Sequence, residues 1–145
     1  MTPVSPSFSY SIEIVYSSNR DFERAPESRV CPNQAMNFMF LGNPGSGKTT
    51  VARIFAEMLA ELKIRGEEFV DVTGQDLLQE GSSKFPALLK KVTPGVLFID
   101  EVYQLNPAGQ GDGQAITNML MKATEDDRAK LSVIVAGMWQ SLLLI

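Results

Sequence analysis

The chain has 145 residues, of which 44% are hydrophobic and 21% charged, with a formal net charge of −4, one cysteine and no histidine. These values describe one ordinary domain with a real core, and the acidic balance argues against a nucleic-acid backbone as the main partner. The absence of histidine excludes a Ser-His-Asp triad and a histidine general base, so carboxylates and lysines must carry any chemistry.

The N-terminal residues MTPVSPSFSYS contain neither a basic leader nor an apolar h-region. No apolar run approaches the roughly 18 residues that a membrane span needs. Cys31 is the only cysteine, so no internal disulfide can form, which fits a reducing compartment. We therefore expect a cytoplasmic protein with no membrane partner.

Three regions are predicted along the chain. Residues 1–33 are rich in Ser, Pro, Asn and Arg and predict an irregular N-terminal arm, in which the alternating patch Ser11–Tyr16 can form a short strand. Residues 34–137 hold the periodic elements and form the predicted core. Residues 138–145 are a mostly apolar C-terminal tail.

The predicted core starts with a strand, a glycine-rich loop and a helix. Met36–Leu41 is a nearly continuous apolar run, which is typical of a strand buried on both faces of a parallel sheet. The glycine-rich loop begins at Gly42. The residues after it recur at helical spacing and predict an amphipathic helix of about four turns across KTTVARIFAEMLAELK. Its apolar face comprises Val51, Ile54, Phe55, Met58, Leu59 and Leu62.

Strands and helices alternate through the rest of the core, which predicts a largely parallel sheet. The elements expected in chain order are a strand at Glu68–Val72, a short helix within Lys84–Val92, a strand at Gly95–Ile99, a helix marked by Ile116, Met119, Leu120 and Ala123, and a strand at Leu131–Ala136.

The glycine-rich loop fills every fixed position of the phosphate-binding pattern GxxxxGK[ST]. Glycines let backbone N–H groups turn inward, and the helix that follows directs its positive end at the phosphates. A glycine-rich turn can simply join a strand to a helix, but such a turn needs no Lys-Thr pair at its end. The predicted nucleotide-binding residues are Gly42, Asn43, Pro44, Gly45, Ser46, Gly47, Lys48, Thr49 and Thr50.

Two carboxylates follow the predicted strand Gly95–Ile99. Asp100 and Glu101 stand at its carboxyl end, where ligands bind in parallel α/β sheets. Such a pair can also be a plain strand end in solvent, but the phosphate loop upstream favours the functional interpretation. We expect Thr49 and Asp100 to hold Mg²⁺, and Glu101 and Lys48 to act in catalysis.

The stretches GNPGSGKTTVARIFAEML, GVLFIDEVYQL and VIVAG together resemble the AAA+ ATPases of the CbbX/CfxQ type, which are P-loop NTPases. The resemblance covers about residues 36–137. It implies a three-layer α/β fold with a mainly parallel sheet, ATP and Mg²⁺ as cofactors, and a machine, usually hexameric, that remodels a client protein. By position Lys48 and Thr49 match the family's phosphate and Mg²⁺ residues, while Asp100 and Glu101 match its metal-binding and catalytic acids.

The sequence departs from this family pattern at several places. LLQEGSSK, ending at Lys84, lacks the aromatic-aliphatic-glycine triplet that grips substrate in the central pore, and Phe85 is a candidate substitute. Gly137-Met138 stands where many AAA+ proteins have a sensing asparagine. Glu125-Asp126-Asp127-Arg128 is most simply a solvated helix end, although an arginine at a subunit edge could reach a neighbouring subunit's nucleotide.

The resemblance also predicts a fifth strand, an arginine finger and a helical lid, none of which is found before Ile145. We therefore expect an incomplete core with weak turnover, because an arginine finger contributes on the order of 10³ to 10⁵ in rate. The strand Met36–Leu41 would then expose an apolar edge. Ser11–Tyr16 or the C-terminal tail is expected to cover it.

Two functions from different classes remain open on the sequence alone. The first is an ATP-binding and ATP-hydrolysing module. The second is a non-enzymatic interaction module whose loops are ordered by the nucleotide. A GTPase is disfavoured because no [NT]KxD motif for reading guanine occurs.

Overall fold

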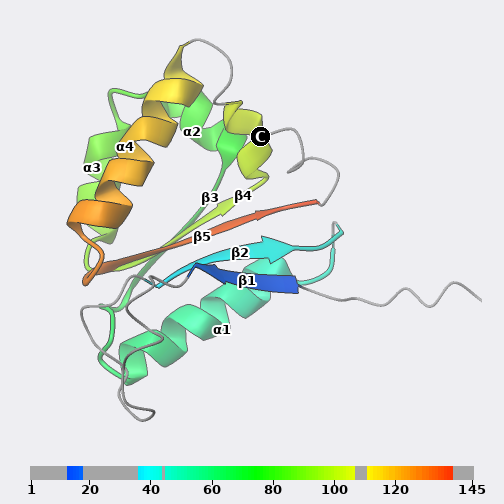
Figure 1. Ribbon diagram of the computed structural model, residues 1–145, viewed down its shortest axis with the longest axis vertical. Helices are drawn as coiled ribbons and strands as arrows, with labels where there is room; N and C mark the ends of the chain where they lie inside the picture. Colours follow the sequence, from blue (N-terminus) through cyan, green and yellow to red (C-terminus); the bar gives the residue numbers. More distant parts are fainter. Residues whose placement is uncertain (1–12, 18–35, 44, 107–110, 139–145) are drawn as a thin grey trace, which may run out of the picture.

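The computed structural model describes residues 13–17, 36–43, 45–106 and 111–138 (Figure 1). Within these residues five strands form one sheet, in the order β1-β2-β5-β4-β3. The last four pair in parallel, and β1 runs antiparallel to β2. The strands are β1 Glu13–Ser17, β2 Asn37–Leu41, β3 Glu68–Thr73, β4 Gly95–Asp100 and β5 Leu131–Gly137.

Helices cover both faces of this sheet, so the predicted three-layer α/β arrangement is confirmed (Figure 1). Helix α1 lies on one face, and α3 and α4 lie on the other with the 3₁₀ turn η2 and helix α2 at one end. The helices are α1 Lys48–Glu61, α2 Gly74–Glu80, α3 Phe85–Val92, η2 Val102–Leu105 and α4 Asp112–Asp126. No helix in the described ranges has the length and apolar character needed to cross a membrane.

Strand β4, which lies between β5 and β3, shows why the apolar runs of the sequence become buried strands. Val96 and Phe98 pack on the α1 side, while Leu97 and Ile99 pack on the α4 side, and all four are fully buried. Burying an aliphatic or aromatic side chain contributes about 1.5–3 kcal/mol. Burial on both faces is therefore found in β4, whereas in β2, for which the sequence predicted it, Met39 is only partly buried.

Helix α2 was not expected from the sequence. Its seven residues are too few for a helical period to emerge, but a local capping box begins it. Thr73 Oγ1 accepts a hydrogen bond from Asp76 N, and Asp76 Oδ2 accepts one from Thr73 N, both at 3.0 Å. Phe85, the suggested pore residue, is a core side chain at the start of α3 with only 2% of its surface exposed.

Helix α2 is held against the turn that follows β4. Gln75 N donates to the side-chain Oε1 of Gln104 at 2.8 Å. A Cβ atom added at Gly74 would lie 2.8 Å from the carbonyl oxygen of Glu101. Because that distance is shorter than real Cβ contacts allow, only glycine lets the first turn of α2 approach the backbone of Glu101 so closely.

Strand β1 pairs with the edge of β2 that we expected to be exposed. Its register pairs Glu13 with Leu41 and Ser17 with Asn37. The hypothesis that the Ser11–Tyr16 patch covers this edge is thus confirmed, with the strand displaced by one or two residues. The alternative cover, the tail, lies outside the described residues beyond Met138.

A buried arginine joins the segment after α1 to the turn between α4 and β5. Arg65 donates to Ser132 Oγ at 2.9 Å, to the carbonyl of Arg128 at 2.8 Å and to that of Ala129 at 3.1 Å. Arg128 precedes the amino end of β5, whereas the phosphate loop follows the carboxyl end of the parallel neighbour β2. Arg128 therefore lies at the amino ends of the parallel strands, whereas this chain's own phosphate loop lies at their carboxyl ends.

Removal of β1 gives a test of the edge pairing. A chain without residues 1–17 should lose at least about 1 kcal/mol of stability, which at this size lowers Tm by roughly 3–5 °C, and should aggregate more readily. A chain without residues 1–12 keeps β1 and is the matched control. Thermal melts and light scattering compare the two, and equal behaviour of both chains would contradict the protective role of β1.

A second test concerns the close approach of α2 to Glu101. Gly74→Ala should lower the free energy of unfolding by about 1–3 kcal/mol, because the added methyl group overpacks a contact made by backbone atoms. Gln75→Ala keeps the amide that donates to Gln104 and should change stability by less than about 0.5 kcal/mol. Urea unfolding measures both. A neutral Gly74→Ala variant would show that the contact is loose in solution.

Candidate functional site

The phosphate loop between β2 and α1 is a tight turn with its backbone open to the surroundings. Gly45 and Gly47 have φ angles of 77° and 90°, which favour glycine. Ser46 N donates to the carbonyl of Asn43 at 3.2 Å and closes the turn. A Cβ atom built on either glycine would meet nothing within 4 Å, so these glycines serve the backbone conformation rather than packing.

The first turn of α1 has the properties of an anion site. Gly47, its N-cap, supplies no side-chain acceptor, and no acidic residue lies in the first turn. The first amides of a helix have no acceptor within the helix, and the helix dipole is positive at this end. An anionic group at this position would therefore find N–H donors and favourable electrostatics.

Lys48 crosses beneath the loop and is 7% exposed. Its Nζ atom donates to the carbonyl oxygen of Gly42 at 2.9 Å and to that of Asn43 at 3.0 Å. An ammonium group has three N–H donors. Two of these donors are hydrogen-bonded to carbonyl oxygens of the loop, so backbone dipoles solvate the positive charge of Lys48 although the side chain is largely buried.

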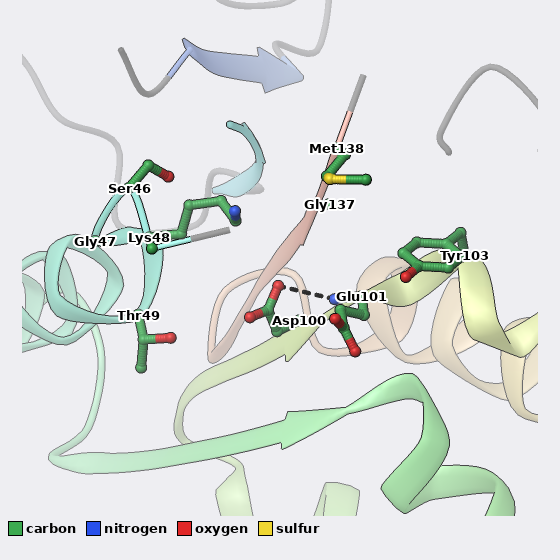
Figure 2. Close-up of a pocket in the computed structure, with 10 residues that line it drawn as sticks. Ser46, Gly47, Lys48, Thr49, Asp100, Glu101, Tyr103, Gly137 and Met138 are labelled. Carbon is green, nitrogen blue, oxygen red and sulfur yellow. Dashed lines mark hydrogen bonds between the residues drawn. The ribbon is translucent and has the colours of Figure 1, made fainter. Parts of the chain in front are cut away.

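The acidic pair stands at the carboxyl end of β4. Asp100 Oδ1 accepts a hydrogen bond from Glu101 N at 2.8 Å, drawn as a dashed line in Figure 2. Glu101 adopts the left-handed conformation, with φ 49°, which is uncommon for a residue with a side chain. The chain therefore turns sharply after β4. As a result, the side chains of Asp100 and Glu101 point in different directions although the two residues are adjacent in sequence.

A cavity of about 450 Å³ brings the loop and the acids together (Figure 2). Thr49 and Asp100 face each other across it in this view. Of the predicted residues, Gly42, Asn43 and Thr50 do not line the cavity, and Pro44 lies outside the described residues. The predicted residues that line it are Gly45, Ser46, Gly47, Lys48, Thr49, Asp100 and Glu101.

Three further residues line the cavity and were not predicted as site residues. Tyr103 comes from η2, while Gly137 and Met138 come from the end of β5. Gly42 N donates to the carbonyl oxygen of Gly137 at 3.2 Å, which ties the start of the loop to β5. The position of Gly137 follows from its place after a parallel strand, whereas Tyr103 enters through a 3₁₀ turn that has no sequence period.

One buried polar atom of the site has no partner within the described residues, namely Ser46 Oγ. Buried hydroxyls are normally hydrogen-bonded, so an orphaned one beside a cavity indicates a ligand or solvent partner. The described residues include no cluster of three or more His, Cys, Asp or Glu side chains able to hold a metal alone. A divalent ion here would need oxygens from a bound ligand in addition to Thr49 and Asp100.

Comparison with known proteins gives a consistent assignment. The family model for AAA, the ATPase family associated with various cellular activities, matches residues 38–142. The chain is 36% identical over 121 residues to stage V sporulation protein K of Bacillus subtilis, and this match covers 79% of the chain and 38% of that protein. It is also 40% identical over 109 residues to protein CbbX of Cereibacter sphaeroides, covering 70% of the chain and 35% of that protein.

A third relative belongs to a secretion system. The ESX-1 secretion system protein EccA1 of Mycobacterium tuberculosis is 36% identical over 123 residues, covering 79% of the chain and 22% of that protein. The chain thus spans less than two fifths of the length of these relatives. The resemblance to AAA+ ATPases of the CbbX/CfxQ type is confirmed, and the chain belongs to the AAA family of ATPases.

Proposed function

We propose that this chain binds ATP with Mg²⁺ and hydrolyses it, as an ATPase module of the protein-remodelling type. The observation that carries the proposal is the cavity between the phosphate loop and the two carboxylates at neighbouring strand ends. Membership of an ATPase family favours this function over a non-enzymatic interaction module.

The triphosphate would be bound by the loop and the first turn of α1. The amides around Gly45–Thr49 are suited to the phosphate oxygens, and the orphaned hydroxyl of Ser46 supports a polar ligand at this place. Lys48 would direct its ammonium group at the outer phosphates. It would use the N–H group that the loop leaves unoccupied, and it could replace its hydrogen bonds to the loop carbonyls with hydrogen bonds to phosphate oxygens.

The residues suited to Mg²⁺ are Thr49 and Asp100. A hydroxyl and a carboxylate are hard oxygen donors, and Mg²⁺ prefers to combine one or two such groups with phosphate oxygens and water. When bound, the ion supplies charge neutralisation between the outer phosphates. Asp100 keeps one carboxylate oxygen for this role, because only Oδ1 accepts from Glu101 N.

Glu101 is the proposed catalytic acid-base residue. Its carboxylate would accept a proton from the attacking water, and Lys48 would stabilise the negative charge that develops on the transferred phosphoryl group. The left-handed turn at Glu101 directs this side chain separately from Asp100, and the contacts of Gly74 and Gln104 support that turn from below. The two acids can therefore serve the metal and the water independently.

The remodelling role and assembly come from the family. AAA+ ATPases of this type usually work as ring-shaped oligomers on a client protein, and we propose both for this chain. Lys48 is the one basic side chain among the residues that line the cavity. A second cation supplied by a neighbouring subunit would raise the rate by on the order of 10³ to 10⁵, so isolated chains should turn over slowly.

The first test of this proposal removes the phosphate-binding lysine. Lys48→Ala should lower affinity for ATP with Mg²⁺ at least about tenfold, because a hydrogen bond to a charged group contributes about 1.5–3 kcal/mol. Lys84→Ala is the control, since Lys84 is an exposed lysine in a surface ion pair with Glu80. Isothermal titration calorimetry measures both. Equal affinity of the two variants would contradict the assignment of Lys48.

The second test separates binding from hydrolysis. Glu101→Gln should bind ATP as the parent does but release phosphate about 10²–10⁴ times more slowly, because the general base is lost. Glu80→Gln, at an exposed acid on α2, is the control. Phosphate release is measured at high protein concentration, where assembly is favoured. Undiminished release by Glu101→Gln would refute its catalytic role, and ATP binding without release by the parent would favour the interaction module.

A further inference from the structure

Tyr103 lines the cavity between the phosphate loop and the acids, and it comes from η2, the turn that follows Glu101. Its side chain is half-buried, and its hydroxyl has no hydrogen-bond partner within the described parts of the chain. Figure 2 shows the ring across the cavity from Lys48 and Thr49, with the hydroxyl oxygen turned toward the acid pair. The hydroxyl is therefore available to a ligand.

Backbone contacts hold η2, and with it Tyr103, in place. Asn106 N donates to the carbonyl oxygen of Tyr103 at 3.1 Å. A Cβ atom added at Gly113, at the start of α4, would collide with the carbonyl oxygen of Leu105 at the end of η2. Helices α2 and α4 thus both pack against this turn. A donor carried by a fixed backbone needs little reordering when a ligand binds.

The side-chain donors are unevenly distributed between the two walls of the cavity. On the wall formed by the loop and α1, three side chains carry N–H or O–H donors. On the opposite wall, ionised carboxylates only accept, and glycine and methionine carry no donor, so Tyr103 is the one side chain there that can donate among the described residues. The loop wall has Ser46, Lys48 and Thr49, and the opposite wall has Asp100, Glu101, Tyr103, Gly137 and Met138.

The terminal phosphate of a triphosphate would need a donor on this opposite wall. Because the acids follow β4 while the loop follows β2, the outer end of a triphosphate held by the loop would point toward the acids and Tyr103. Carboxylates repel an anionic phosphate at short range, whereas a phenolic O–H can donate a hydrogen bond to it. Tyr103 is therefore matched to the terminal phosphate rather than to the inner ones.

We propose that the hydroxyl of Tyr103 donates a hydrogen bond to the terminal phosphate of bound ATP and so makes the site prefer ATP to ADP. This inference rests on the proposed binding of ATP in the cavity. It gives Tyr103 a role in specificity and not in proton transfer, because the phenol keeps its proton and no covalent bond changes at this residue.

The test compares two nucleotides on one variant. Tyr103→Phe removes the hydroxyl and keeps the ring. Its affinity for the β,γ-imido analogue of ATP should fall about tenfold or more, because the lost hydrogen bond is to a charged group, while its affinity for ADP should change less than about twofold. Isothermal titration calorimetry with Mg²⁺ measures both affinities, and the analogue makes the result independent of turnover. A merely structural effect would lower both affinities alike and leave their ratio unchanged.

A hydroxyl outside the cavity provides the matched control. Thr124→Val removes a hydroxyl of α4 that donates to the carbonyl oxygen of Met121 at 2.7 Å, and it should leave both affinities unchanged. Circular dichroism verifies folding, and Tyr103→Leu, which also lacks the hydroxyl, replaces Tyr103→Phe if that variant unfolds. If the parent binds both nucleotides and the variant keeps the parent's affinity ratio, this inference fails while the proposed ATP binding stands. A parent that binds neither nucleotide would refute both.

Discussion

The insertion of β5 between β2 and β4 is the constraint on which the site depends. β5 pairs in parallel with both neighbours, so the carboxyl ends of β2 and β4 lie at the same edge but two strand spacings apart. Two spacings of about 4.8 Å give roughly 10 Å between the loop after β2 and the acids after β4. The cavity between the loop and the acids occupies this interval, and it is also lined by Gly137 at the end of β5 and by Met138, which follows it. Adjacent pairing of β2 and β4 would bring the loop and acids too close to leave such a space.

A second theme is how the site keeps a buried cation in place. Burying a charge is costly unless polar groups surround it. Lys48 meets this condition through two carbonyl oxygens of its own loop, which also hold the turn closed. These two hydrogen bonds tie Lys48 to the described part of the loop, while the helix amides and the Ser46 hydroxyl keep their capacity for a ligand. Binding groups held in place in this way lower the ordering cost of binding.

The sequence predicted the elements whose pattern extends over a full period, and it missed those that depend on contacts. Four parallel strands, helix α1 and the loop follow from apolar runs and fixed glycine and lysine positions. Helix α2 could not be predicted from periodicity, because a single capping box and the contact of Gly74 with Glu101 position it. Tyr103 was missed as a site residue for a related reason, since a four-residue 3₁₀ turn has no recognisable pattern. The two sides of the cavity and Gly137 after β5 were foreseeable, but Tyr103 was not.

The position of β5 also has a consequence for the order in which the protein is made. Of the five described strands, β5 leaves the ribosome last, yet it must enter between two strands that are already synthesised. Until then β2 and β4 each lack a neighbour, and a nascent sheet in this condition offers open hydrogen-bonding edges to other chains. The antiparallel partner β1 is available from the outset and protects one flank of β2 during this interval. Long-range parallel pairing of this kind forms slowly, so biosynthesis of this domain has a late, vulnerable step at its central strand.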